Sequence, residues 1–451
     1  MLFKRSTLAS GLLLTLALPC SVQATNGYMS HGFGTKSKGM AGAGSALPQD
    51  AMISATNVAG VVWLSEQRLD IGASLFTPSR DYTQHSMVSG IPGRPPIPIG
   101  SELTGTGAVE SDRDLFLIPH FAYSHPLDEI SALGVALYGN GGMNTTYRAS
   151  DTMMGQGTYG GAQLSPSDAS TGVDLIQVAL NLNYSRKLSE EFSVGAGLIL
   201  AYQSFKAKGL ASLGNLAADG NPDNLSRNGR ENVLGWGVQL GALWQVNDRL
   251  SLAAAYQTQV DFERFEQYDD LFAENGDLDA PALVNLGLAF KATSDLTLNF
   301  DIQHIWYSDV NALGNDMTRN IQLCMQGQTA HCLGGSQGVG FGWRDMTIYK
   351  IGAQWAMRPD LTLRAGYSYG KQPVPEDGVL FNVIAPAVIE QHFTLGLTKE
   401  LDERMEISFA AMYAPEGDLD CGCSLPFSGG PKSINIAMEQ WELELSVGWR
   451  F

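Results

Sequence analysis

The chain has 451 residues, of which 16% are charged, against about 25% in soluble domains. Its 51 glycines exceed the usual share of about 7%, and its formal net charge is −18. The acidic balance argues against nucleic acid and other anionic polymers as partners, and the length favours one large domain over two or three.

Residues 1–24 have the pattern of a secretory signal peptide. Lys4 and Arg5 precede an apolar core at 12–18, and a cleavage site follows at 22–24. Beyond this segment, no run approaches the roughly 18 apolar residues of a membrane helix. The mature chain is therefore either a periplasmic protein or a closed barrel, because only helices and closed barrels satisfy every backbone group in lipid.

Residues 25–64 are rich in glycine and carry only three charged side chains, Lys36, Lys38 and Asp50. They do not alternate between apolar and polar residues, so we do not expect strands here. A large barrel encloses more space than its wall side chains fill. We therefore predict that this segment folds into the lumen as a hatch; the alternative is a disordered periplasmic tail.

Segments with period-two alternation recur through residues 65–451 and predict strands. The clearest is the last, in which Trp441, Leu443 and Leu445 alternate with Glu442 and Glu444. The predicted strands lie at about 69–77, 115–124, 131–140, 174–186, 192–204, 231–246, 250–262, 282–292, 296–308, 344–357, 361–370, 389–400, 405–414 and 440–451.

The connections between these strands alternate between short and long. Turns such as 126–130 and 187–191 are short, whereas 78–114 and 141–173 are long. Short periplasmic turns, long outer loops and an even number of strands are typical of outer-membrane barrels. We predict an all-β fold, a transmembrane antiparallel barrel of about 14 strands with the N-terminal hatch inside, in the outer membrane of a Gram-negative bacterium.

Two outer loops show helical rather than strand-like apolar spacing. Leu210 and Leu213 lie in one of them, and Phe262 and Phe265 lie in the other. We expect each loop to form a short amphipathic helix whose apolar face is covered. The acidic face of the second helix is either solvated or binds divalent cations between lipopolysaccharide head groups; it comprises Glu263, Glu266, Asp269, Asp270 and Glu274.

Four cysteines follow the signal segment, Cys324, Cys332, Cys421 and Cys423. In an oxidising compartment they predict disulfides, either within each pair of neighbours or across the two loops. A metal site is the weaker alternative, because His331 is the one further ligand nearby. We predict no metal and no cofactor.

Strand parity directs Lys350 and Arg364 into the lumen. A buried cation requires an anionic partner. The partner is either a wall carboxylate (Asp301, Glu442 or Glu444) or the carboxylate of a ligand. The seven histidines are scattered and form no catalytic set with serine, so we do not predict an enzyme.

The order of these features resembles the FadL/TodX family. The resemblance lies in G-F-G-T-K-S-K-G-M-A-G-A-G-S-A at 32–46, in A-T-N-V-A-G-V at 55–61, and in the strand, loop and terminal Phe451 pattern that follows. Family members commonly carry Asn-Pro-Ala at the end of the hatch, where this chain has Asn57-Val58-Ala59. The resemblance implies a passive outer-membrane channel for hydrophobic compounds, with long-chain fatty acids as the preferred class and aromatic hydrocarbons as the alternative. A non-transport surface barrel stays open as a further alternative.

The resemblance also implies roles for particular residues. The implied ligand-capture groove in the outer loops comprises Leu210, Leu213, Phe262 and Phe265; the lumen and hatch site comprises Lys350, Arg364, Phe33 and Met29; and the lateral gap, where the third strand bends inward, comprises Gly139, Gly141 and Gly142. Expected partners are the hydrophobic ligand, outer-membrane lipid and lipopolysaccharide, and the barrel-assembly machinery through Phe451. We expect a monomer.

Overall fold

The computed structural model describes residues 26–86, 108–148, 170–219, 223–421 and 432–451. The predicted signal segment at 1–24 and Cys423 lie outside these ranges. No helix among the described residues has the length and apolar character needed to cross a membrane.

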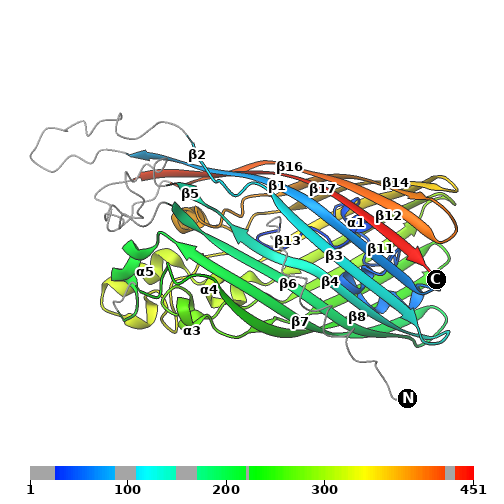
Figure 1. The fold of residues 1–451 in the computed structure, drawn as a ribbon, viewed down its shortest axis with the longest axis horizontal. Coiled ribbons are helices and arrows are strands. Elements are labelled where there is room, and N and C mark those ends of the chain that lie inside the picture. Colours follow the sequence, from blue (N-terminus) through cyan, green and yellow to red (C-terminus); the bar gives the residue numbers. More distant parts are fainter. Residues whose placement is uncertain (1–25, 87–107, 149–169, 220–222, 422–431) are drawn as a thin grey trace, which may run out of the picture.

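The described residues form 17 strands in one sheet, three of them only two residues long. Consecutive long strands pair antiparallel, and the last pairs with the first from Arg68↔Arg450 to Ser86↔Lys432, which closes the barrel (Figure 1). The long strands are β1 Arg68–Ser86, β3 Phe116–Pro126, β4 Ser131–Asn144, β6 Ser170–Lys187, β7 Phe192–Lys208, β8 Glu231–Asn247, β9 Leu250–Gln257, β11 Leu283–Lys291, β12 Leu296–Ile305, β13 Met346–Arg358, β14 Leu361–Gly370, β15 Gln391–Glu400, β16 Met405–Cys421 and β17 Lys432–Arg450. The short ones are β2 Val109–Glu110, β5 Tyr147–Arg148 and β10 Asp261–Phe262.

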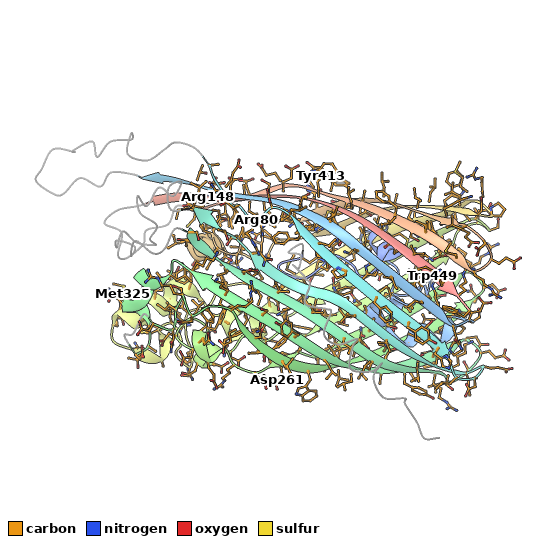
Figure 2. All side chains as sticks on the ribbon, in the orientation of Figure 1. Arg80, Arg148, Asp261, Met325, Tyr413 and Trp449 are labelled. Carbon is orange, nitrogen blue, oxygen red and sulfur yellow. A yellow bond between two sulfur atoms is a disulfide. The ribbon has the colours of Figure 1, made fainter. Side chains whose placement is uncertain are left out.

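The predicted barrel of 14 strands is confirmed. Alternation also assigns the faces correctly: Leu443 and Leu445 are about half exposed on the outside, whereas Glu442 and Glu444 are buried inside. β1, β16 and β17 extend further toward the outer loops than we predicted. Figure 2 shows side chains standing out from the strands along the barrel in this view.

The short turns are built on side-chain hydrogen bonds to the backbone. Asp128 Oδ1 accepts from Ile130 N (2.9 Å) and from Ser131 Oγ (2.6 Å). Asp402 Oδ1 accepts in the same way from Arg404 N (2.8 Å) and Met405 N (2.9 Å). Such aspartates tighten a turn locally.

The opposite end carries the long loops with their short helices (Figure 1). These are η2 Ala211–Leu216, η3 Glu266–Tyr268, α3 Ala273–Gly276, η4 Tyr307–Asp309, α4 Asn311–Gly314, α5 Met317–Met325, η5 Thr329–His331, η6 Glu376–Gly378 and α6 Val379–Asn382. The expectation of two regular amphipathic helices is corrected: the first is a single 3₁₀ segment, and the second is divided among β10, η3 and the kinked α3. The apolar residues of both loops recur with helical spacing because they are buried. Tertiary packing buries them without forming a continuous helix.

The N-terminal segment, residues 26–64, contains α1 Thr35–Lys38, α2 Ile53–Thr56 and η1 Val58–Trp63. Most of it is buried, and it contacts strands around the inside of the barrel, from β4 and β6–β8 to β15–β17. α1 lies so close to β15 that a Cβ added to Gly39 would come within 3.0 Å of the Gly396 Cα. Glycine at both positions therefore permits this contact.

Candidate functional site: an apolar cavity above a gap in the wall

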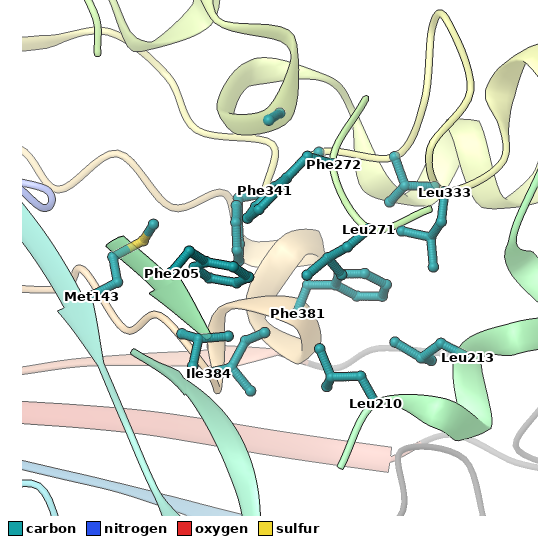
Figure 3. Close-up of a pocket in the computed structure, with 14 residues that line it drawn as sticks. Met143, Phe205, Leu210, Leu213, Leu271, Phe272, Leu333, Phe341, Phe381 and Ile384 are labelled. Carbon is teal, nitrogen blue, oxygen red and sulfur yellow. The ribbon is translucent and has the colours of Figure 1, made fainter. Parts of the chain in front are cut away.

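An apolar cavity lies under the outer loops (Figure 3). The empty space among its side chains, with the open solvent at its mouth included, is about 570 Å³. None of the 14 residues that line it is charged or polar. The lining comprises Met143, Val173, Phe205, Leu210, Leu213, Leu271, Phe272, Ala312, Leu333, Val339, Gly340, Phe341, Phe381 and Ile384.

Two of the predicted capture residues line this cavity, and two lie behind it. Leu210 and Leu213 project into it from the loop that follows β7. Phe265 packs against Phe205, with ring centroids 5.5 Å apart, and Phe262 is buried nearby. Phe265 therefore supports the wall of the cavity, whereas Phe262 is buried without lining it.

Sequence analysis missed the opposite wall, which Phe341, Phe381 and Ile384 supply. Phe381 lies in α6, in the outer loop between β14 and β15, where the sequence analysis predicted no apolar face. The signal was present: V-L-F-N-V-I at 379–384 is an apolar run inside an outer loop. Such a run must be covered, and here it is covered by packing over the mouth of the barrel.

A disulfide ties down the loop that roofs the cavity. Cys324 and Cys332 are bonded to one another, as one of our alternatives predicted. Leu333, the next residue, donates a backbone hydrogen bond to Leu216 O (2.8 Å) and accepts one from Ala218 N (2.9 Å). Cys421 is also disulfide-bonded.

Two carboxyl groups in the outer loop that contains Phe262 and Phe265 have raised pKa values. Burial raises the pKa of Asp279 to about 6, although its oxygens accept from Phe262 N (2.7 Å) and Gln259 Nε2 (2.6 Å). Burial, reinforced by the neighbouring Asp219, raises the pKa of Asp270 to about 6. The packing of this loop therefore disfavours the charged forms of these two carboxyl groups.

The wall of the barrel is incompletely paired below the cavity. β3 and β4 pair only from Phe121↔Leu137 down to Pro126↔Ala132. Above that level β4 pairs only with β6, through an irregularity between Gly139 and Gly141. The predicted glycines thus lie where β4 no longer pairs with β3, as expected for glycine-associated bulges.

The N-terminal segment fills the inner side of this unpaired stretch. Met29 forms a β-bridge with Gly141, and Gly142 N donates to Tyr28 O (2.9 Å). A Cβ on Gly141 would come within 2.6 Å of the Tyr28 ring. Phe33 packs on Tyr138 of β4 with ring centroids 4.6 Å apart. Met29 and Phe33 thus lie beside the gap, and neither lines the cavity.

Lys350 and Arg364 are buried on the inside of the barrel, as parity predicts. Lys350 Nζ donates to His31 O (2.9 Å). Arg364 donates to Gln49 Oε1 (2.9 Å) and to Thr398 Oγ1 (2.7 Å). Both cations are therefore bonded to the N-terminal segment or to the wall, and a role in binding ligand stays a prediction.

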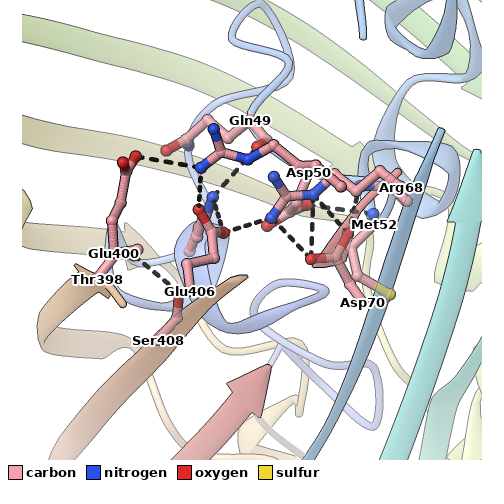
Figure 4. A network of polar contacts seen from close by, with 12 residues as sticks. Gln49, Asp50, Met52, Arg68, Asp70, Thr398, Glu400, Glu406 and Ser408 are labelled. Atoms are coloured by element: carbon pink, nitrogen blue, oxygen red, sulfur yellow. Dashed lines mark hydrogen bonds and ion pairs between the residues drawn. The ribbon is translucent and has the colours of Figure 1, made fainter. Parts of the chain in front are cut away.

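Carboxylates on the inside of the barrel wall form ion pairs with lysines of the N-terminal segment. Lys38 Nζ lies 2.5 Å from Glu442 Oε1 and 2.7 Å from Glu444 Oε2. At the end with the short turns, Lys36 Nζ lies 2.5 Å from Glu406 Oε1, and Arg68 bridges Glu406 and Asp70 (Figure 4). These buried ion pairs hold the segment inside the barrel, because either charge would be left unpaired without the other.

The Asn57-Val58-Ala59 motif lies near the end of the N-terminal segment, where η1 begins. Asn57 is fully buried, and its side chain caps η1 by accepting from Ala59 N (3.1 Å). Its amide donates to Ser45 O (3.1 Å) and Ala242 O (3.2 Å). Val58 occupies the first position of the helix, where proline is tolerated but not required, so the departure from Asn-Pro-Ala leaves the turn intact.

Comparisons with known proteins agree with this architecture. A family model described as "Outer membrane protein transport protein (OMPP1/FadL/TodX)" matches residues 16–419. The toluene transporter TodX of P. putida is 20% identical, with a TM-score of 0.68 over 93% of this chain and 99% of that one. A Pseudomonas aeruginosa FadL homologue is 16% identical, with a TM-score of 0.66 over 94% and 100%. The toluene transporter TbuX of Ralstonia pickettii is 16% identical, with a TM-score of 0.61 over 93% and 99%.

No curated protein sequence matches the chain. The family model nevertheless covers most of its length, and the barrel has the fold of solved transporters of this kind. The protein is thus a transport protein of the bacterial outer membrane and not an enzyme. It belongs to the OMPP1/FadL/TodX family of outer-membrane transport proteins.

Proposed function

We propose that the protein takes up small, uncharged hydrophobic compounds such as monoaromatic hydrocarbons, which enter through the cavity under the outer loops. The observation that carries this proposal is the lining, which includes four phenylalanines and no polar side chain. A carboxylate held among these residues would lose its hydration without gaining a partner. Two of the structural neighbours, TodX and TbuX, are described as toluene transporters.

The route that we propose leads from the cavity to the gap in the wall. Met143 lines the cavity, and Gly141 and Gly142 at the gap immediately precede it on β4. Tyr28 and Met29 occupy the inner side of the gap. A shift of these residues would open a lateral path into the membrane, along which an apolar solute diffuses without entering water. In this proposal the N-terminal segment is the hatch.

Long-chain fatty acids are the second candidate. Lys350 and Arg364 favour them, because each could exchange a neutral protein acceptor for a carboxylate if the N-terminal segment moved. Such a ligand would place its acyl chain in the cavity and its head group toward the lumen.

Filling the cavity tests the proposal. Leu213→Trp places a bulky side chain in the cavity, and Leu200→Trp adds the same side chain on the lipid-facing side of β7 as the matched control. Each variant and the wild-type gene are expressed in a strain that lacks the gene, and the initial uptake of radiolabelled toluene and oleate is measured. We expect the wild type and Leu200→Trp to restore toluene uptake, and Leu213→Trp to leave it at the level of the deletion strain.

Restoration of oleate uptake without toluene uptake would select the fatty-acid candidate. Equal toluene uptake by Leu213→Trp and Leu200→Trp would contradict entry through this cavity. Restoration of neither uptake by the wild-type gene would contradict transport of both classes and favour a surface role.

A further inference from the structure

The outer face of β7 changes character along its length. Leu198, Leu200 and Tyr202 are each just over 40% exposed and point outward on the same side of the strand. Lys206 and Lys208 continue the same parity toward the outer loops. Apolar residues followed by an aromatic residue mark the edge of the lipid core, so the two lysines lie at the level of the lipid head groups.

Neighbouring strands bring two guanidinium groups to the same place. Asp174 of β6, which is paired in register with Lys206, holds Arg113 (Nη2–Oδ2 3.0 Å) and also forms an ion pair with Arg230. Arg230 Nη1 donates to Ser204 Oγ (3.0 Å). We call Arg113, Lys206, Lys208 and Arg230 the cationic patch.

The cationic patch has excess positive charge. One carboxylate, Asp174, is shared by two arginines. Within the ranges that the structure describes, neither Lys206 nor Lys208 forms an ion pair. Both arginines are more than a third exposed, so all four cations remain accessible from outside. Asp174 and Ser204 fix the Arg230 guanidinium in place, which lowers the entropy lost when it binds an anion.

The far side of the same rim is acidic. Asp81 on β1 lies near Glu416 of β16 and Glu110 of β2. Glu439 of β17 points outward on the same side. In a chain of net charge −18, four cations around one carboxylate are therefore a local feature of the β6–β8 side.

We propose that the cationic patch binds a phosphorylated glycolipid of the outer leaflet through its phosphate groups. Guanidinium and ammonium groups are the usual protein partners of phosphate, and arginine adds paired hydrogen bonds. The acyl chains of such a lipid lie along Leu198, Leu200 and Tyr202, directly below its head group. The interaction is independent of the transported solute, because the patch lies on the outside of the barrel.

Titration of the purified full-length protein in non-ionic detergent tests this proposal. The probes are lipid A with both phosphates and the same lipid after enzymatic dephosphorylation, with binding followed by native mass spectrometry. The patch variant is Lys206→Gln with Lys208→Gln. The matched control, Lys291→Gln with Arg249→Gln, removes two exposed cations beside a short turn at the opposite end.

We expect the patch variant to bind the phosphorylated lipid about thirtyfold more weakly, since each of the two lysines near a lipid surface contributes about a factor of five. The control should bind like the wild type, and Lys206→Arg with Lys208→Arg should retain affinity. Dephosphorylated lipid should bind wild type and patch variant equally and weakly.

Three results would overturn the proposal. The first is equal affinity of wild type and patch variant for the phosphorylated lipid. The second is the same loss of affinity in the control. The third is saturation of the patch by inorganic phosphate at the lipid's own concentration, which would make free phosphate and not a lipid the ligand.

Discussion

Buried polar side chains anchor the N-terminal segment to the wall of the barrel in addition to its apolar packing, and Asn57 is one of them. Asn57 contacts three parts of the chain: η1, the backbone at Ser45, and β8 at Ala242. None of its polar atoms has access to water. One buried amide therefore fixes the end of the segment against the wall.

Asn57→Ala should loosen this segment while leaving the barrel intact. Removal of the amide leaves buried backbone groups without partners, at a cost of about 1–3 kcal/mol. Trypsin cleavage at Lys36 or Lys38 measures the effect, because both sites are buried while the segment is packed. Cleavage should accelerate in Asn57→Ala but not in Asn435→Ala on the outside of β17. An unchanged cleavage rate would show that the amide does not hold the segment.

At the scale of elements, we expect the stability of the loop between β9 and β11 to depend on pH. The pKa of Asp279 is about 6 in the folded loop, above its ordinary value of about 3.8. The folded loop therefore binds more protons than the open loop between these values, and its stability falls as pH rises through this window. Asp270 acts in the same direction.

Amide hydrogen exchange in residues 262–280 should therefore show more protection at pH 5 than at pH 8, after correction for the intrinsic pH dependence of exchange. Asp279→Asn should reduce this difference, because the amide carries no charge at either pH. Greater protection at pH 8 would contradict the sign of the linkage.

Sequence patterns predicted the strands well and the loops poorly, for a physical reason. A strand between lipid and lumen must alternate at every position, so 440–451 could be assigned from its own residues. A loop residue such as Phe381 is buried by contacts with residues far away in the chain, and local periodicity does not encode those contacts. Strand parity predicted that Lys350 points inward. It could not predict that Lys350 donates to the backbone oxygen of His31, which lies far away in the chain.

At the scale of the whole molecule, our transport proposal requires the N-terminal segment to move relative to the wall. A Cβ on Gly134 of β4 would lie 2.6 Å from Ser54 Oγ in α2, so cysteines introduced at both positions could form a disulfide once the amide of Asn183 shifts aside. This bond would tie the segment to the strand that borders the gap.

Ser54→Cys with Gly134→Cys should therefore stop toluene uptake when oxidised and recover it on reduction. Mass spectrometry verifies the bond, while the wild type and Ser54→Cys alone report any effect of the reductant on the native disulfides. Uptake at the wild-type rate by the fully bonded variant would exclude motion of α2 from the mechanism.

The pairing of Lys38 with Glu442 and Glu444 has a consequence for biogenesis. The anions belong to β17, whereas the lysine belongs to α1, and Lys38 and Glu442 are separated by 404 positions in the chain. Lys38 therefore gains these counter-charges only once β17 is in place, and β17 also forms the seam with β1. Docking of the N-terminal segment and closure of the barrel are therefore coupled through one strand, β17.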